Sequence, residues 1–127
     1  MAVSAVILSD KDFETVVKVT TTGTNTNASI VDASALEGAA TDPRLSIVAC
    51  QWTTGSQTNI LFDATSNDVA LSLNGNGAYN VGAQSMPSIP NPGSSGATGD
   101  ILLTNGSASV GTIWLKLRKV SGYNNLK

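Results

Sequence analysis

The sequence predicts a single all-β domain: an antiparallel β-sandwich, jelly-roll or immunoglobulin-like, of about eight strands. Three observations favour this class. Apolar residues recur mainly with a period of two, which is the side-chain period of a half-buried strand. The candidate strands are separated by clusters of turn-forming residues, and about two residues in five are Ser, Thr, Asn or Gly. Hydrophobic residues nevertheless make up 41% of the chain, which is enough for one core at this length.

Eight segments have the alternation and the β-branched composition of strands. They are residues 3–8, 13–20, 28–33, 45–52, 59–63, 69–73, 100–104 and 112–120. Gly-containing turns are predicted at residues 54–56 and 74–77, and Asn105-Gly106 predicts a hairpin between the last two segments. Residues 34–37 (SALE) fit a capping box, so at most one short helix is expected.

Two parts of the chain stand outside this pattern. Residues 1–9 are apolar but short, carry no basic residue and are followed at once by acidic residues, so we expect an N-terminal arm rather than a signal peptide. Residues 80–99 contain three prolines, which lack ladder donors, and predict a long Pro/Gly/Ser loop. This loop is either functional or an ordered crossover at one end of the sandwich. Residues 1–127 are interpreted as one domain.

Composition excludes several classes of function. With no histidine, the chain has no Ser-His-Asp triad and no imidazole metal ligand. A net charge of −2 argues against nonspecific nucleic-acid binding, and no apolar stretch is long enough for a membrane helix. The spacing of Asp10, Asp12 and Glu14 would suit Ca²⁺, which binds carboxylate oxygens. We favour the interpretation that these carboxylates are exposed to water where the next strand begins. Cys50 lies in an apolar run and is expected to be buried. We therefore predict no catalytic residue, no cofactor and no metal.

The last predicted strand is the most informative for binding. Its alternation directs Ile113, Leu115 and Leu117 to the core. Trp114, with two neighbouring cations, is directed to the outer face, either as an interface anchor or as a cover over a strand edge. Trp52 alternates with core positions and is expected to be buried. The candidate interface comprises Val3, Val6 and Leu8 of the arm and Trp114, Lys116, Arg118 and Lys119 of the last strand, with the three cations forming a basic patch.

Three segments carry a resemblance to a known class of proteins. Residues 88–92 (SIPNP), 98–104 (TGDILLT) and 114–123 (WLKLRKVSGY) together resemble small virion structural proteins of tailed bacteriophages, particularly those of marine bacteria and cyanobacteria. The resemblance implies a non-enzymatic β protein of the virion, made in the host cytoplasm. A capsid decoration or cement protein bound to the major capsid protein lattice is the first expectation, and a tail or fibre component is the second.

Two further expectations accompany this resemblance. Decoration proteins in general suggest a homo-oligomer, with a trimer favoured. A chain in which only 13% of the residues are charged suits a particle in seawater, where charges are screened within a few Å. The alternative class is a carbohydrate-binding adhesion module, in which an exposed aromatic such as Trp114 or Tyr79 contacts the sugar.

Overall fold

The computed structural model describes residues 2–11, 13–81, 86–93, 95–105 and 110–124. These residues form eight strands and one turn of 3-10 helix, η1 (Ala33–Ala35). The strands are β1 (Ala2–Asp10), β2 (Glu14–Thr22), β3 (Asn25–Val31), β4 (Ala39–Phe62), β5 (Asp68–Tyr79), β6 (Ile89–Pro90), β7 (Ile101–Asn105) and β8 (Gly111–Tyr123). The predicted all-β class with about eight antiparallel strands is confirmed. Among the described residues, no helix has the length and apolar character needed to cross a membrane.

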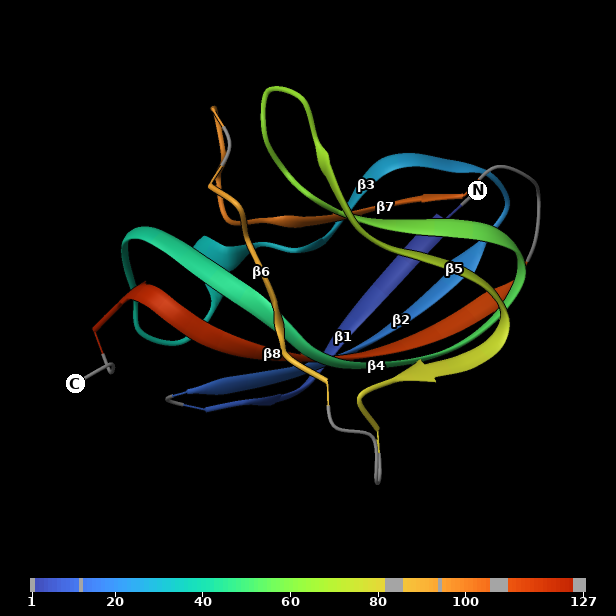
Figure 1. Ribbon diagram of the computed structural model, residues 1–127, viewed down its shortest axis with the longest axis horizontal. Helices are drawn as coiled ribbons and strands as arrows, with labels where there is room; N and C mark the ends of the chain where they lie inside the picture. Colours follow the sequence, from blue (N-terminus) through green and yellow to red (C-terminus); the bar gives the residue numbers. More distant parts are fainter. Residues whose placement is uncertain (1, 12, 82–85, 94, 106–109, 125–127) are drawn as a thin grey trace.

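All eight strands belong to one strongly curled, open sheet (Figure 1). The strand order is β1-β2-β8-β4-β7-β3, and β5 and β6 also pair with β4. The end strands β1 and β3 contact each other without forming a ladder in the described part of the chain. The predicted sandwich of two separate sheets is therefore replaced by a half-barrel.

The long strand β4 is the reason for this difference. Residues 45–52 and 59–63 are predicted as two strands joined by a turn, but both segments, apart from residue 63, lie in one strand of 24 residues. Its residues 39–54 pair with β8 and its residues 58–62 pair with β7, so one strand continues through both parts of the sheet. The register with β5 shifts between Thr54 and Thr58, where the Gly-containing sequence bends the strand instead of ending it.

Other turn predictions were wrong for related reasons. β5 continues through the predicted turn at residues 74–77, with Gly75 at φ +69° inside the strand. In the described part of the chain, β7 and β8 pair with successive parts of β4 rather than with each other, and residues 106–109 of the predicted hairpin lie outside the described residues. The predicted capping box is replaced by a cap two residues earlier, where Asp32 accepts a hydrogen bond from the Ser34 backbone N–H.

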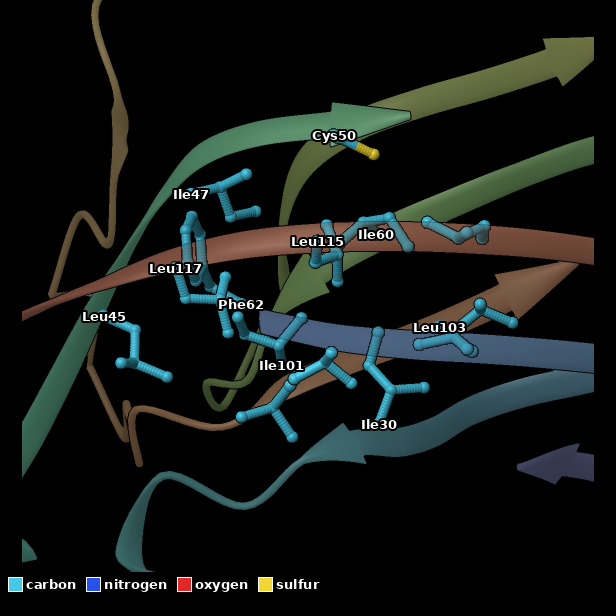
Figure 2. Close-up of a cluster of buried hydrophobic side chains, with 14 of the residues drawn as sticks. Ile30, Leu45, Ile47, Cys50, Ile60, Phe62, Ile101, Leu103, Leu115 and Leu117 are labelled. Carbon is cyan, nitrogen blue, oxygen red and sulfur yellow. The ribbon is translucent and has the colours of Figure 1, made fainter. Parts of the chain in front are cut away.

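The hydrophobic core lies on the inner side of the curled sheet (Figure 2). Ile113, Leu115 and Leu117 of β8 are fully buried, which confirms the alternation predicted for the last strand. They meet side chains from β3, β4 and β7, including Ile30, Leu45, Ile47, Ile60, Phe62, Ile101 and Leu103. Trp52 packs against this core and remains partly accessible.

The described parts of the Pro-rich segment 80–99 run across β4. β6 pairs with Ser46 and Ile47 of that strand. The Tyr79 hydroxyl donates to the carbonyl of Pro87 at 2.6 Å, and the Asn80 amide donates to the carbonyl of Val48 at 2.8 Å. These bonds favour an ordered crossover. Residues 82–85 and 94 of the predicted loop lie outside the described residues.

The predicted N-terminal arm forms β1. Its ladder with β2 begins with Ala2 opposite Thr22 and ends with Asp10 opposite Thr15. The register shifts after Ile7, which places a bulge at Leu8. In this structure the segment is an edge strand of the sheet rather than a detached extension.

Candidate functional site

The outer face of the sheet brings Val6 of the predicted arm together with Trp114 of the last strand. Val3 of the arm instead lies opposite buried Thr21 and packs against the core, and Leu8 lies at the bulge. Val6 of β1 lies opposite Lys18 of β2, and Lys18 lies opposite Trp114 of β8. Trp114 lies in turn opposite Gln51 of β4. Directly opposed residues point to the same side of a sheet, so these side chains form one row across four strands. Trp114 is 38% exposed and Val6 is 52% exposed.

A second and a third row lie next to this one along the strands. Lys116 is opposite Val16, and Arg118 is opposite Glu14. The Lys116 ammonium lies 3.5 Å from a Glu14 carboxylate oxygen in an exposed pair, a class of ion pair that contributes about 1 kcal/mol or less. We call the surface formed by Val6, Val16, Lys18, Trp114, Lys116 and Arg118 the Trp114 face.

A shallow groove of about 130 Å³ lies beside the indole. Its lining is mainly apolar and comes from β2, β4, β8 and the residue Val81 after β5. The lining residues are Val16, Ala49, Cys50, Gln51, Val81, Trp114, Leu115 and Lys116. The Trp114 face thus combines a half-exposed indole, a small apolar depression and three cations, Lys18, Lys116 and Arg118. Of these groups, the exposed Trp114 and Arg118 are of the types enriched at protein interfaces.

The predicted basic patch needs one correction. Lys119 is 2% exposed and points to the inner side of the sheet. Its odd number gives it the orientation of Leu115 and Leu117, so it cannot share a face with Lys116 and Arg118. The third cation of the patch is Lys18, whose alternation with buried Val17 and Val19 was a usable signal in the sequence.

Lys119 instead closes one end of the half-barrel. Its ammonium lies 2.7 Å from an Asp10 carboxylate oxygen, and it donates to the backbone carbonyls of Lys11 at 2.7 Å and Glu37 at 2.8 Å. The ammonium also lies 5.2 Å from the centre of the Tyr123 ring. All three donors have acceptors, so this buried cation ties the β1–β2 turn and the segment after η1 to the last strand.

Asp10 is the anionic partner in this network. Burial alone would raise the pKa of its carboxyl, but hydrogen bonds from Lys119, the Glu37 backbone N–H and Thr15 lower the pKa overall. Glu14 of the predicted acidic trio lies on the outer face, and Asp12 lies outside the described residues. Within the described ranges, no group of three potential ligands of the His, Cys, Asp or Glu type is arranged to hold a metal.

A larger open cleft of about 640 Å³ lies at the same end of the sheet. It is lined by Asp10, Lys11, Phe13, Glu14, Glu37 and Arg118. Phe13 is 55% exposed, and its ring is surrounded by charged side chains of both signs. The sequence does not indicate this cleft. Glu37 is distant in sequence from the other lining residues and comes near them only in the folded chain.

Cys50 is buried, as expected, and desolvation raises the pKa of its thiol to about 12. A thiol in this state is a poor nucleophile at neutral pH.

Comparisons with protein-family models, with curated proteins and with solved structures found no match. Functional inference for this chain therefore depends on its own residues and on the resemblance in its sequence.

Proposed function

We propose that this protein is a non-enzymatic structural protein of a virion, which decorates the capsid by docking its Trp114 face on the major capsid protein lattice. The virion assignment is based on the resemblance carried by residues 88–92, 98–104 and 114–123. The observation that carries the docking mode is Trp114, which is half-exposed between Lys18 and Gln51 on the outer face of a paired strand. A large aromatic side chain in that position loses apolar exposure when a partner covers it.

The charges of the Trp114 face specify the partner's chemistry. Lys18, Lys116 and Arg118 outnumber Glu14 on this face, although the whole chain has a net charge of −2. The complementary surface would carry carboxylates around an apolar side chain that fits the groove beside Trp114. Apolar contact at the indole would persist in salty water, where screening weakens the ionic contacts.

Binding to capsids that lack the protein tests this proposal. Trp114→Ala should weaken binding by about thirtyfold or more if the indole is an interface anchor. The free energy of unfolding of the free protein should change by no more than about 1 kcal/mol, because the indole does not belong to the core. Thr112→Ala, two residues away on the same outer face, is the matched control. Wild-type affinity of the Trp114→Ala variant would contradict the docking mode.

Charge reversal provides a second test. Lys116→Glu combined with Arg118→Glu should slow association and weaken binding to an acidic surface. Lys11→Glu changes the charge of an exposed lysine that is not part of the Trp114 face, although it lines the same cleft as Arg118, and should have a smaller effect. The double variant changes the net charge by about twice as much as Lys11→Glu, so an effect per substituted charge that is the same in both variants would indicate a response to total charge and would count against this face.

The copy number distinguishes the capsid from the tail. Hundreds of copies per particle are expected for capsid decoration, whereas a few copies or a few tens would identify a tail or fibre component. Quantitative mass spectrometry of purified particles, with the major capsid protein as the internal standard, measures this number.

One observation favours carbohydrate binding as a second candidate. Phe13 provides an exposed ring in a cleft with Glu14, Glu37 and Arg118, which are groups able to stack on a sugar and hydrogen-bond its hydroxyls. Tyr79 is less suitable, because its hydroxyl already donates to Pro87. Glycan-array binding abolished by Phe13→Ala and retained by Trp114→Ala would favour this candidate over decoration.

A further inference from the structure

The outer edge of β1 lacks the charged residues and the proline that usually protect an edge strand, although β1 also contacts β3 without pairing with it. β1 is at one end of the strand order, and within the described residues its ladder is with β2 alone. Val6, Ile7 and Leu8 are 52%, 49% and 54% exposed. Residues 2–9 contain no charged residue and no proline, although natural edge strands commonly use both to prevent association. The bulge at Leu8 interrupts the edge only after Ile7.

We propose that this edge pairs antiparallel with β1 of a second copy of the chain, about a two-fold axis at Val6. Residues 4–8 are all exposed, and Val6 is the centre of that run. With the axis at this point, Val6 lies opposite its own copy and Ala5 lies opposite Ile7 of the other chain. The two curled sheets would then form one continuous sheet.

The side-chain period of two supports this register. Ala5 and Ile7 lie opposite buried Val19 and Val17, so both point to the inner side of the sheet. Val6 lies opposite Lys18 and points outward. With the axis at Val6, residues that point to the inner side in one chain lie opposite residues that point to the inner side in the other. A register shifted by one residue would place the inner side of one chain on the outer side of the other. The apolar inner surface then continues from one copy to the next and covers Ile7.

Charge favours a second copy as the occupant of this edge. An uncharged strand meets no like charge when it pairs with itself. The Trp114 face is less suited to pairing with itself, because its excess of positive charge would be repeated on both copies. Self-association at the β1 edge and docking through the Trp114 face therefore have Val6 in common, but the cations and the indole of that face do not take part in the self-pairing. The two-fold pairing gives a dimer and can be correct whether or not the chain binds a capsid.

Sedimentation equilibrium of the wild type and of Ile7→Lys tests the proposal. The wild type should sediment as a dimer, and Ile7→Lys should weaken the dimer by about tenfold or more, because it places a charge on the paired edge. Thr53→Lys adds the same charge on the exposed outer face of β4 and should leave the dimer unchanged. The unfolding midpoint of each variant shows whether its fold is retained. A wild type that is monomeric or trimeric, or a folded Ile7→Lys variant as dimeric as the wild type, would overturn the proposal.

Cross-linking tests the register independently. Val6→Cys should form an intermolecular disulfide under mild oxidation, because directly opposed residues have the required Cα separation. Ala5→Cys is the matched control: in this register the two Ala5 residues lie about 8 Å apart, which is too far for a disulfide. The native Cys50 is buried and should not compete. Cross-linking of Ala5→Cys as fast as, or faster than, that of Val6→Cys would refute the register.

Discussion

Replacement of the buried Lys119 by methionine tests whether its ion pair holds one end of the half-barrel together. The change keeps most of the side-chain volume and removes the charge. Asp10 would lose its 2.7 Å partner, and the carbonyls of Lys11 and Glu37 would each lose a hydrogen bond. Removing one partner of a buried pair leaves an uncompensated charge, and such variants lose about 3–5 kcal/mol. Lys119 is 2% exposed, so water cannot easily replace it.

The same strand provides a matched control. Lys116 is also paired with a carboxylate, Glu14, but both side chains of that pair are nearly half exposed. Lys116→Met should therefore cost at most about 1 kcal/mol. Chemical denaturation of both variants measures the difference directly, provided that the transitions remain two-state. Equal costs for the two substitutions, or a cost below about 1 kcal/mol for Lys119→Met, would refute the assignment of Lys119 as the structural cation.

The pH dependence of stability provides a second readout for the same network. The pKa of Asp10 is lower in the folded chain than in the unfolded chain. In acidic solution the unfolded chain therefore binds more protons than the folded chain, and the free energy of unfolding falls. The stabilisation is complete above the ordinary Asp pKa of about 3.9 and is lost as the pH falls through the lower, folded value. Lys119→Met removes a hydrogen bond that lowers this pKa, so the variant should lose less stability than the wild type between about pH 5 and pH 2.

Three further predictions concern single sites elsewhere in the fold. Gly77→Ala should cost about 1–3 kcal/mol, because a Cβ at this position would lie 2.5 Å from the Trp52 ring, and Trp52→Val should reduce that cost in the double variant. Cys50 should not react with a thiol reagent until the protein unfolds, so stoichiometric labelling of the native protein would contradict its burial. Burial, with added repulsion from Asp32 and Asp63, raises the pKa of Asp100 despite a hydrogen bond from the Ala33 N–H. Asp100→Asn should therefore raise the melting temperature at pH 7, with the gain absent near pH 3 where the carboxyl is protonated.

Strand alternation predicted the local structure of the chain more reliably than its connections. It placed Ile113, Leu115 and Leu117 in the core and Trp114 outside, because a period of two is a property of one strand. The prediction that Lys119 belongs to the patch follows from its nearness in sequence to Arg118 and disagrees with its own alternation. A lysine on the inner face requires a buried anion, and Asp10 reaches that position only when β1, β2 and β8 have assembled.

The continuity of β4 depends on interactions that a local sequence does not contain. The segment around Gly55 suits either a turn or a bend, because both accept small polar residues. Ladders with β5 on both sides of this segment, and with β8 and β7 in succession, keep the strand extended. The same ladders turn an expected two-sheet sandwich into one curled sheet.

The two surfaces proposed for binding differ in their expected response to salt. Pairing of β1 with its copy uses backbone hydrogen bonds and the apolar side chains of Val6 and Ile7, with no charged residue in the paired strand. Docking through the Trp114 face also uses Lys18, Lys116 and Arg118, whose attraction to carboxylates falls as the screening length shortens to about 3 Å at 1 M salt. Raising the salt concentration should therefore leave the dimer largely intact and weaken binding to an acidic partner. The affinity that remains at high salt should come from the apolar contact of Trp114. A dimer that dissociates in salt would instead place charged groups in the self-association interface, and β1 has none to contribute between residues 2 and 9.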